Sequence, residues 1–358
     1  MGFVTQGPYS RNVGSRTYLM DDSEHYEMFK LKNKEFTVTV DVSQMPCGLN
    51  GALYFVEMPR DGGKTGGNAA GAKYGTGYCD AQCPHDIKFI GGEANCDGWD
   101  PNPKDPNAGA GKYGSCCAEF DIWEANKISS AFTNHPCLHD GQKRCEGTEC
   151  GDNKSDERYQ GTCDKDGCDL NAFRAGVEDF FGPGKTVDTN SPITVVTQFI
   201  TSDGTDEGDL TEVRRFFVQN GQVHAHPQSD VPSLGGQYNS LTDEMCDAMK
   251  GAFGDVNDHK KKGGLKKMGE SMANGHVLVM SIWDDHEADM LWLDSTSPAT
   301  KTGKASGGPR GTCATSSGRP SDVESQHPHA HVTFSDIKFG EICSTFNCPG
   351  EEELIFTQ

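Results

Sequence analysis

The feature that most restricts the fold of this chain is its cysteine content, fifteen residues in 358. They include the adjacent pair Cys116-Cys117 and a closely spaced series at positions 137, 145, 150, 163 and 168. This density is typical of disulfide-bonded proteins that mature in oxidising compartments. Zinc binding by Cys79, Cys83 and the adjacent pair is the weaker alternative, because no second C-x-x-C motif accompanies them. We therefore expect a secreted, extracellular protein.

The charge and hydropathy of the chain restrict its partners. Its formal net charge of −21 argues against nucleic acid, whose binding needs a basic surface. No run of about 18 apolar residues occurs, so we expect no membrane span. The one basic run, Lys260–Lys262 with Lys266 and Lys267, surrounds Gly263-Gly264, and we interpret it as a solvated loop.

The first residues, Met1–Gln6, lack the basic start and the apolar segment of a secretory signal peptide. A disulfide-rich chain must be exported to become oxidised, so a start without a signal contradicts the cysteine content. We therefore expect that the chain lacks its N-terminal part.

Five segments have the β-branched and aromatic residues of strands, and several of them alternate between apolar and polar positions. They are residues 35–42, 52–56, 193–200, 276–282 and 331–339. Residues 213–218 and Val223 flank Asn220-Gly221, which predicts a hairpin with a two-residue turn. One helix is expected, with Thr242 as its N-cap and Gly251 near its end. Because helices and strands do not alternate regularly, a parallel α/β sheet is disfavoured.

Long loops rich in Gly, Asp, Asn and Cys separate these strands, at residues 59–77, 95–115, 137–170 and 296–320. Loops of this length are ordered when they are functional or cross-linked, and here the cysteines supply the cross-links. An all-β sandwich that carries these loops over one face is the simplest architecture. We find no internal repeat and no linker to a second module, so we expect one domain.

The segment Glu119–Glu124, EFDIWE, carries three carboxylates. In a strand, Glu119 and Asp121 point to the same face, whereas Glu124 points to the other. A β-bulge between Asp121 and Glu124 would return Glu124 to the shared face. Two glutamates placed there with carboxyls about 5–5.5 Å apart would form the nucleophile and acid/base pair of a retaining glycosidase.

Asp121, beside Glu119 on that face, would share a proton or a hydrogen bond with it and separate the carboxyl pKa values. The spacing alone leaves an alternative open, a strand whose acidic residues simply face solvent. A helix is less favoured, because Phe120 and Ile122 prefer strands and positions five apart lie about 140° apart on a helix.

Residues Gly114–Asn126, GSCCAEFDIWEAN, closely resemble the active-site signature of family 7 glycoside hydrolases, the fungal-type cellobiohydrolases and endoglucanases. The likeness extends over nearly the whole chain, through Gly2–Gln6, Val40–Phe55 and Val332–Gly340. It implies a concanavalin-like β-jelly roll, two curved antiparallel sheets with a substrate cleft along the concave face. We expect one catalytic domain over residues 1–358, with a C-terminal tail at 341–358 and no carbohydrate-binding module.

The resemblance also implies roles for individual residues. Glu119 matches the nucleophile of the family, Asp121 its partner, and Glu124 the acid/base. His135 matches a histidine near the leaving-group side. Tyr54, Asp80 and Gln82 match residues that contact the glucose units on the non-leaving side of the scissile bond. Arg16, Asn50 and Lys88 match more remote contacts.

Trp283 and Trp292 match sugar platforms around the scissile bond, because glucose rings present apolar C–H faces to aromatic side chains. A calcium loop starting at Asp164 is excluded, since the positions that need acceptors are Cys168 and Ala175. We expect no metal and no cofactor, and we interpret the alternating histidines 327, 329 and 331 as surface residues. The residues that match the polar cluster at the product end are Arg158, Asp164, Asp166, Asp169, Arg174 and Arg310.

The segments 145–174 and 296–313 keep the length of the loops that roof the cleft in the exo-acting branch of the family. The expected activity is therefore that of a retaining cellulase that hydrolyses β-1,4-glucosidic bonds, a cellobiohydrolase releasing cellobiose from the reducing ends of cellulose. Its partners would be cellulose and cello-oligosaccharides, and it would act as a monomer. Two alternatives remain, an endo-β-1,4-glucanase of the same family and a non-catalytic, lectin-like glucan-binding domain. An ion pair between Lys154 and Glu287 would close the roof.

The resemblance further implies a disulfide pattern. Cys343–Cys348 would add one small loop, and Cys96 is left over. The sequon Asn153–Ser155 is the one glycosylation signal. The implied pairs are Cys47–Cys313, Cys79–Cys117, Cys83–Cys116, Cys137–Cys163, Cys145–Cys150 and Cys168–Cys246.

Overall fold

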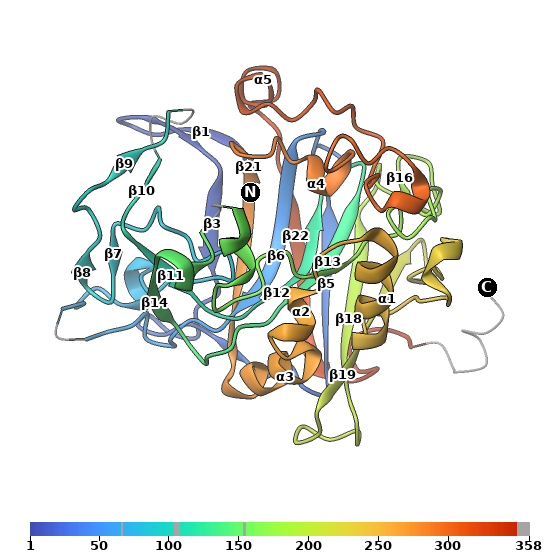
Figure 1. The fold of residues 1–358 in the computed structure, drawn as a ribbon, viewed down its shortest axis with the longest axis horizontal. Helices are drawn as coiled ribbons and strands as arrows, with labels where there is room; N and C mark the ends of the chain where they lie inside the picture. The colour runs from blue at the N-terminus through green and yellow to red at the C-terminus, as the bar shows by residue number, and fades with distance from the viewer. Residues whose placement is uncertain (66, 104–107, 153–154, 349–358) are drawn as a thin grey trace.

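The computed structural model describes residues 1–65, 67–103, 108–152 and 155–348, and two antiparallel sheets form its centre (Figure 1). The seven-stranded sheet has the order β15-β13-β12-β6-β21-β3, with β4 also paired to β21. The five-stranded sheet has the order β20-β19-β18-β5-β22. The strands of the first sheet are β15 Cys168–Leu170, β13 Ser130–His135, β12 Glu119–Ala125, β6 Leu49–Val56, β21 His276–Asp284, β3 Ser15–Tyr18 and β4 Met28–Phe29. Those of the second are β20 Gln222–Ala225, β19 Leu210–Gln219, β18 Ile193–Thr201, β5 Lys34–Asp41 and β22 Thr333–Glu341.

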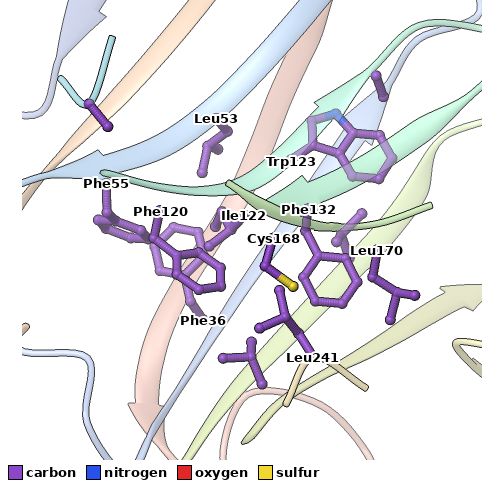
Figure 2. Packing of buried hydrophobic residues seen from close by; sticks show 14 of the residues in the cluster. Phe36, Leu53, Phe55, Phe120, Ile122, Trp123, Phe132, Cys168, Leu170 and Leu241 are labelled. Atoms are coloured by element: carbon purple, nitrogen blue, oxygen red, sulfur yellow. The ribbon is translucent and has the colours of Figure 1, made fainter. Parts of the chain in front are cut away.

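The hydrophobic core lies between the two sheets. Phe36 of β5 and Phe55 of β6 meet edge to face, with ring centroids 5.1 Å apart, and Phe120 of β12 meets Phe199 of β18 at 5.5 Å. Figure 2 shows Phe120 and Ile122 beside Phe36, and Trp123, farther along the strand, belongs to the same buried cluster. The predicted all-β sandwich is confirmed.

The five predicted strands are all present as β5, β6, β18, β21 and β22, with ends shifted by a few residues. The hairpin between β19 and β20 turns at Asn220 and Gly221, whose φ angles are 54° and 77°. These positive values suit the Asn-Gly pair. The predicted helix is α1, Asp243–Phe253, and the hydroxyl of Thr242 accepts a hydrogen bond from the main-chain N–H of Met245.

The interpretation of the basic run as a solvated loop is wrong, because this region forms α2, Asp258–Lys261, and α3, Gly264–Asn274. In α3, Leu265, Met268 and Met272 recur on one face and are fully buried. The two glycines between the lysines do not form a loop but join two helices, with Gly263 at φ 93°. Further short helices are α4 Leu291–Asp294 and α5 Pro320–Gln326, with single 3₁₀ turns at Ala72–Tyr74, Gly147–Cys150, Ser155–Tyr159, Pro232–Leu234 and Lys304–Ser306.

The long connections contain short strands that the sequence did not indicate. Most of them lie away from the two main sheets, on the left of Figure 1. Two of them pair across distant sequence, β11 Tyr113–Cys116 with β14 Lys143–Glu146. The others are β1 Val4–Gln6, β2 Arg11–Val13, β7 Phe89–Ile90, β8 Glu93–Ala94, β9 Asp100–Pro101, β10 Gly109–Ala110, β16 Phe181–Gly182 and β17 Val187–Asp188.

Disulfides cross-link these connections. Cys79, Cys83 and the Cys116-Cys117 pair are joined to one another as two disulfides, which replaces the zinc alternative. Cys96 is exposed and free. The seven bonded pairs are Cys47–Cys313, Cys79–Cys117, Cys83–Cys116, Cys137–Cys163, Cys145–Cys150, Cys168–Cys246 and Cys343–Cys348.

The segment expected as a C-terminal tail is anchored where the structure describes it. The buried carboxylate of Glu35 accepts hydrogen bonds from the main-chain N–H groups of Cys343 and Thr345, at 2.9 and 2.8 Å. Residues 341–348 therefore belong to the folded body. The expected Lys154–Glu287 ion pair and the sequon at Asn153 lie outside the described residues. Among the described helices, none has the length and apolar character needed to cross a bilayer.

Candidate active site

The candidate site is built on β12, where a bulge interrupts the pairing between Asp121 and Glu124. On the inner side of the sheet, Phe120, Ile122 and Trp123 enter the core, so two consecutive residues share that side. The extra residue reverses the parity of the strand beyond it. The predicted bulge is confirmed, and it places Glu119, Asp121 and Glu124 on the face of the sheet opposite the core.

The neighbouring strands complete this face, hereafter the carboxylate face. His135 lies opposite Glu119, and Thr133 lies opposite Asp121 on β13. On the other side, Tyr54 of β6 lies opposite Asp121. Cross-strand neighbours in an antiparallel sheet have Cβ atoms about 5 Å apart, so these polar groups form one continuous patch.

Main-chain and amide donors contact the two glutamates. The N–H of Ala81 donates to Glu119 Oε2 at 3.0 Å. The side-chain amide of Asn50 donates to Glu124 Oε1 at 2.9 Å, and the Thr133 hydroxyl lies 3.4 Å from Oε2. The expectation of Asn50 as a remote contact is wrong, because β6 lies beside β12 and brings this amide directly to Glu124.

Asp121 is paired with His135. The Nε2 atom of His135 lies 3.2 Å from Asp121 Oδ2, and Nδ1 donates to the main-chain carbonyl of Asp164 at 2.8 Å. Burial opposes the charged imidazole, but the hydrogen bond and charge of Asp121 outweigh it and raise the pKa of His135 to about 9. A positive imidazolium therefore lies beside the three carboxyls at neutral pH.

Burial is the largest influence on the protonation of Glu124. It raises the pKa of Glu124 to about 8, and the charge of Asp121 acts in the same direction. The positive His135 and the donor Asn50 oppose this rise. At neutral pH the Glu124 carboxyl is therefore mainly protonated and able to donate a proton.

Burial also raises the pKa of Glu119, helped by the charges of Asp121 and Asp80. The direction is the same as for Glu124, so burial alone does not show which glutamate is the nucleophile and which is the acid/base. The Ala81 N–H acts against burial, because it stabilises the carboxylate form of Glu119. Acids that interact this strongly titrate as a group.

Tyr78, which was not among the residues expected from the sequence, contacts three of the predicted sugar contacts, Tyr54, Asp80 and Arg16. The Tyr78 hydroxyl donates to Asp80 Oδ2 at 2.6 Å and lies 2.9 Å from the Tyr54 hydroxyl. The guanidinium of Arg16 lies over the Tyr78 ring, 3.4 Å from its centroid. Gln82 donates to the carbonyl of Lys165. The alternation of residues 78, 80 and 82 was the available signal.

Lys88 lies over the ring of Trp99, 5.5 Å from its centroid, in the part of the molecule built from short strands. Trp283, at the end of β21, lies opposite Asn50 of β6. Its ring is 6.1 Å from that of Trp292, and the two planes are 30° apart. The indole N–H of Trp292 donates to Asp285 at 2.8 Å, which fixes the second ring. Both tryptophans are half-buried, as a stacking platform requires.

The predicted product-end cluster divides into two ion-pair groups. Arg158 donates to Asp166 at 2.6 Å. Asp169, opposite Thr133 on β15, pairs with both Arg174 and Arg310. Burial would raise the pKa of Asp169, but the two guanidinium groups outweigh it and hold that pKa well below its usual range.

Asp164 does not belong with these groups as a sugar contact. Its side chain is 0 % exposed, and Oδ1 accepts the main-chain N–H of Gly167 within its own loop. The expectation that it grips substrate is therefore wrong. Its main-chain carbonyl instead holds His135.

Close groups of possible metal ligands mostly consist of cysteines already in disulfides. The one group among the described residues without a cysteine is Asp284, His286 and Glu324, and Arg11 already pairs with Glu324 at 3.2 Å. Residues 327, 329 and 331 are exposed and join no such group within the described chain.

Comparisons with known proteins find relatives over nearly the whole chain. A family model described as "Glycosyl hydrolase family 7" matches residues 1–346. A cellobiohydrolase from Daphnia pulex is 57% identical, with a TM-score of 0.95 over 97% of this chain and 79% of that one. A cellobiohydrolase from Melanocarpus albomyces, solved with cellotetraose, is 45% identical, with a TM-score of 0.91 and coverage of 97% and 79%. The Humicola insolens endocellulase EGI is 37% identical, with a TM-score of 0.79 and coverage of 96% and 79%.

Proposed function

The chain belongs to glycosyl hydrolase family 7, and we propose that it is a retaining cellobiohydrolase that releases cellobiose from the reducing ends of cellulose chains. One observation carries the proposal, the bulge that gathers Glu119, Asp121 and Glu124 on one face of β12. Exo action is supported by the two cellobiohydrolases, which are 57% and 45% identical, against 37% for the endocellulase.

In the proposed first step, the Glu119 carboxylate attacks the anomeric carbon and the glycosidic bond breaks. Glu124 gives its proton to the departing oxygen, a role that suits a carboxyl with a pKa of about 8. A glycosyl ester to Glu119 results. In the second step, the Glu124 carboxylate takes a proton from water, which attacks the same carbon and releases Glu119. Two inversions give net retention.

Asp121 and His135 are proposed to tune this pair. The Asp121 charge disfavours ionisation of its neighbours, and the imidazolium partly neutralises it. The imidazolium therefore limits the repulsion that the Asp121 charge exerts on the neighbouring glutamates. Asp121 is a positioning residue in this scheme, because it acts through Glu119.

Sugar units are proposed to lie along the carboxylate face on both sides of the scissile bond. Trp283 and Trp292 would stack on apolar sugar faces, and Tyr54, Asp80 and Arg16 would contact the units on the non-leaving side. The ion pairs of Asp166 and Asp169 would bind the product hydroxyls, since charged donors and acceptors make the stronger hydrogen bonds. The residues of that product end are Arg158, Asp166, Asp169, Arg174 and Arg310.

Secretion is also part of the proposal. The seven disulfides support an oxidising site of maturation and an extracellular place of action, where a polymer substrate is found.

The experiment that tests this function is product analysis on soluble cello-oligosaccharides and on cellulose. Release of cellobiose as the β-anomer would support a retaining cellobiohydrolase. Random shortening of the chains would instead favour an endo-β-1,4-glucanase. Glu119→Gln removes the nucleophile but keeps its shape, so turnover should fall by several orders of magnitude while cello-oligosaccharides still bind. Activity that survives Glu119→Gln would overturn the assignment.

A further inference from the structure

The bulge that places Glu124 depends on a residue without a cross-strand partner. On the β13 side, pairing passes from Asp121 directly to Glu124, and on the β6 side from Asp121 to Trp123. Ile122 is therefore unpaired on both sides. A buried main-chain carbonyl that loses its sheet partner costs free energy unless another donor reaches it.

That donor is Arg215, on β19 of the opposite sheet. Its Nη2 donates to the main-chain carbonyl of Ile122 across the core. The side chain is 2% exposed, and its guanidinium lies 4.4 Å from the ring centroid of Phe132. Within the described chain, no carboxylate pairs with Arg215, and its Nε has no protein partner.

A cation buried without a carboxylate is expensive, because its lost hydration is only partly replaced. Burial lowers the pKa of Arg215 to about 9, which leaves the guanidinium charged at neutral pH. Its contacts are the rings of Phe132 and Phe217, the second at 5.9 Å from its centroid, and the Ile122 carbonyl. The specific polar contact of this buried charge is therefore the extra residue of the bulge.

We propose that Arg215 is a positioning residue for Glu124: it holds the bulge carbonyl from the opposite sheet and so fixes the acid/base relative to Glu119. The inference rests on the proposed role of Glu124. If the bulge relaxes, the glutamate two residues beyond Ile122 shifts along the strand. A misplacement of about 1 Å in a catalytic group costs about 100-fold in rate.

The test compares two substrates that differ in their need for an acid. Cleavage of cellotetraose needs protonation of the leaving oxygen, whereas a dinitrophenyl cellobioside loses a stable phenolate without it. The measurement is kcat/KM on both, because this ratio reports the first chemical step. The variants are Arg215→Met, which keeps the apolar stem but removes the donor, and Arg215→Lys, which keeps a charged donor.

We expect Arg215→Met to lose about 10- to 100-fold on cellotetraose and less than about 3-fold on the dinitrophenyl substrate. Arg215→Lys should recover part of the cellotetraose activity. Leu210→Ala is the matched control, a buried residue at the start of the same strand, β19, that lies against Gly269 of helix α3. It should lower the melting temperature without changing the ratio between the two substrates.

Equal losses on both substrates for Arg215→Met would overturn the inference, since they would indicate general damage to the core. If this variant does not fold, Arg215→Lys carries the test, and an equal loss on both substrates would be as decisive. Glu124→Gln distinguishes a failure of the role proposed for Glu124 from a failure of the role proposed for Arg215. If it shows no preference for the activated substrate, the proposed role of Glu124 fails; if it does and Arg215→Met does not, only the role of Arg215 fails.

Discussion

At the residue scale, the proposed chemistry depends on how a buried cluster of acids shares its protons. Glu119 and Glu124 both lie less than a tenth exposed, with Asp121 between them in sequence. Water can stabilise their charges only weakly, so each ionisation must be supported by a nearby donor or cation. The main-chain N–H of Ala81 and the side chains of Asn50 and His135 provide that support, and the two side chains can be replaced separately.

Removing the Asn50 amide should shift the pH profile of catalysis. Its hydrogen bond favours the ionised form of Glu124, so Asn50→Ala should raise the pKa of Glu124 above about 8. Glu124 then keeps its proton to higher pH, and the basic limb of kcat/KM should move upward by about one unit. Asn274→Ala, which removes an amide from Glu57 instead, is the control. A downward shift for Asn50→Ala would contradict the acid role.

The same carboxyl should make stability depend on pH. Burial raises the pKa of Glu124 from 4.5 to about 8, so its contribution to stability is present below pH 4.5 and is lost as the pH rises through 8. Glu124→Gln has no proton to lose. The difference in melting temperature, variant minus wild type, should therefore become more positive as the pH rises from 5 to 8, as measured by calorimetry at each pH. Exposed Glu207→Gln should give no such trend.

At the element scale, β12 and α1 show how local signals and packing combine. The β12 bulge gives one strand two consecutive core residues, and the opposite sheet supplies the donor for its unpaired carbonyl. Helix α1 is tied to β15 by Cys168–Cys246, next to Asp169 of the proposed product end. Stability of α1 therefore supports the position of β15.

The N-cap of α1 can be tested directly. Thr242→Ala removes the acceptor for the Met245 N–H and should lower the free energy of unfolding by about 1 kcal/mol. Denaturant unfolding measures this difference. Thr242→Ser keeps an N-cap hydroxyl and should stay close to the wild type, and an equal loss in both variants would assign the effect to packing.

At the scale of the whole molecule, disulfides hold together segments that are far apart in sequence. Cys47–Cys313 spans 266 residues and joins the entry of β6 to the loop after α4. Cys145–Cys150 spans five. A cross-link that closes a longer loop removes more entropy from the unfolded chain, so the first bond should contribute more.

Replacing Cys47 and Cys313 together by serine should therefore lower stability by about 2–5 kcal/mol. The double variant of Cys145 and Cys150 is the matched comparison and should lose less. Thermal unfolding of both proteins gives the order, and activity at low temperature should survive the first change, since neither sulfur lies on the carboxylate face. A larger loss for the short loop would mean that the loop around Cys145 depends on local packing.

The sequence by itself determined five strands of the two sheets, the hairpin at Asn220, the N-cap at Thr242 and the need for a bulge before Glu124. These features follow from local preferences and from the period of two along a strand, which neighbouring residues encode. Helix α3 was missed because its glycines imitate a loop, while its burial comes from packing against distant strands.

Only the tertiary structure decided the contacts that cross the sheet and the core. The Asn50 amide reaches Glu124 because β6 pairs with β12 across about 70 residues of sequence, a separation that local patterns do not encode. The Asp164 side chain points inward, where its carboxylate accepts a hydrogen bond from the main-chain N–H of Gly167. Arg215 of β19 reaches the main-chain carbonyl of Ile122 because the two sheets pack face to face. Hydrogen bonds between distant segments depend on how the chain packs, and this is why they became visible only in three dimensions.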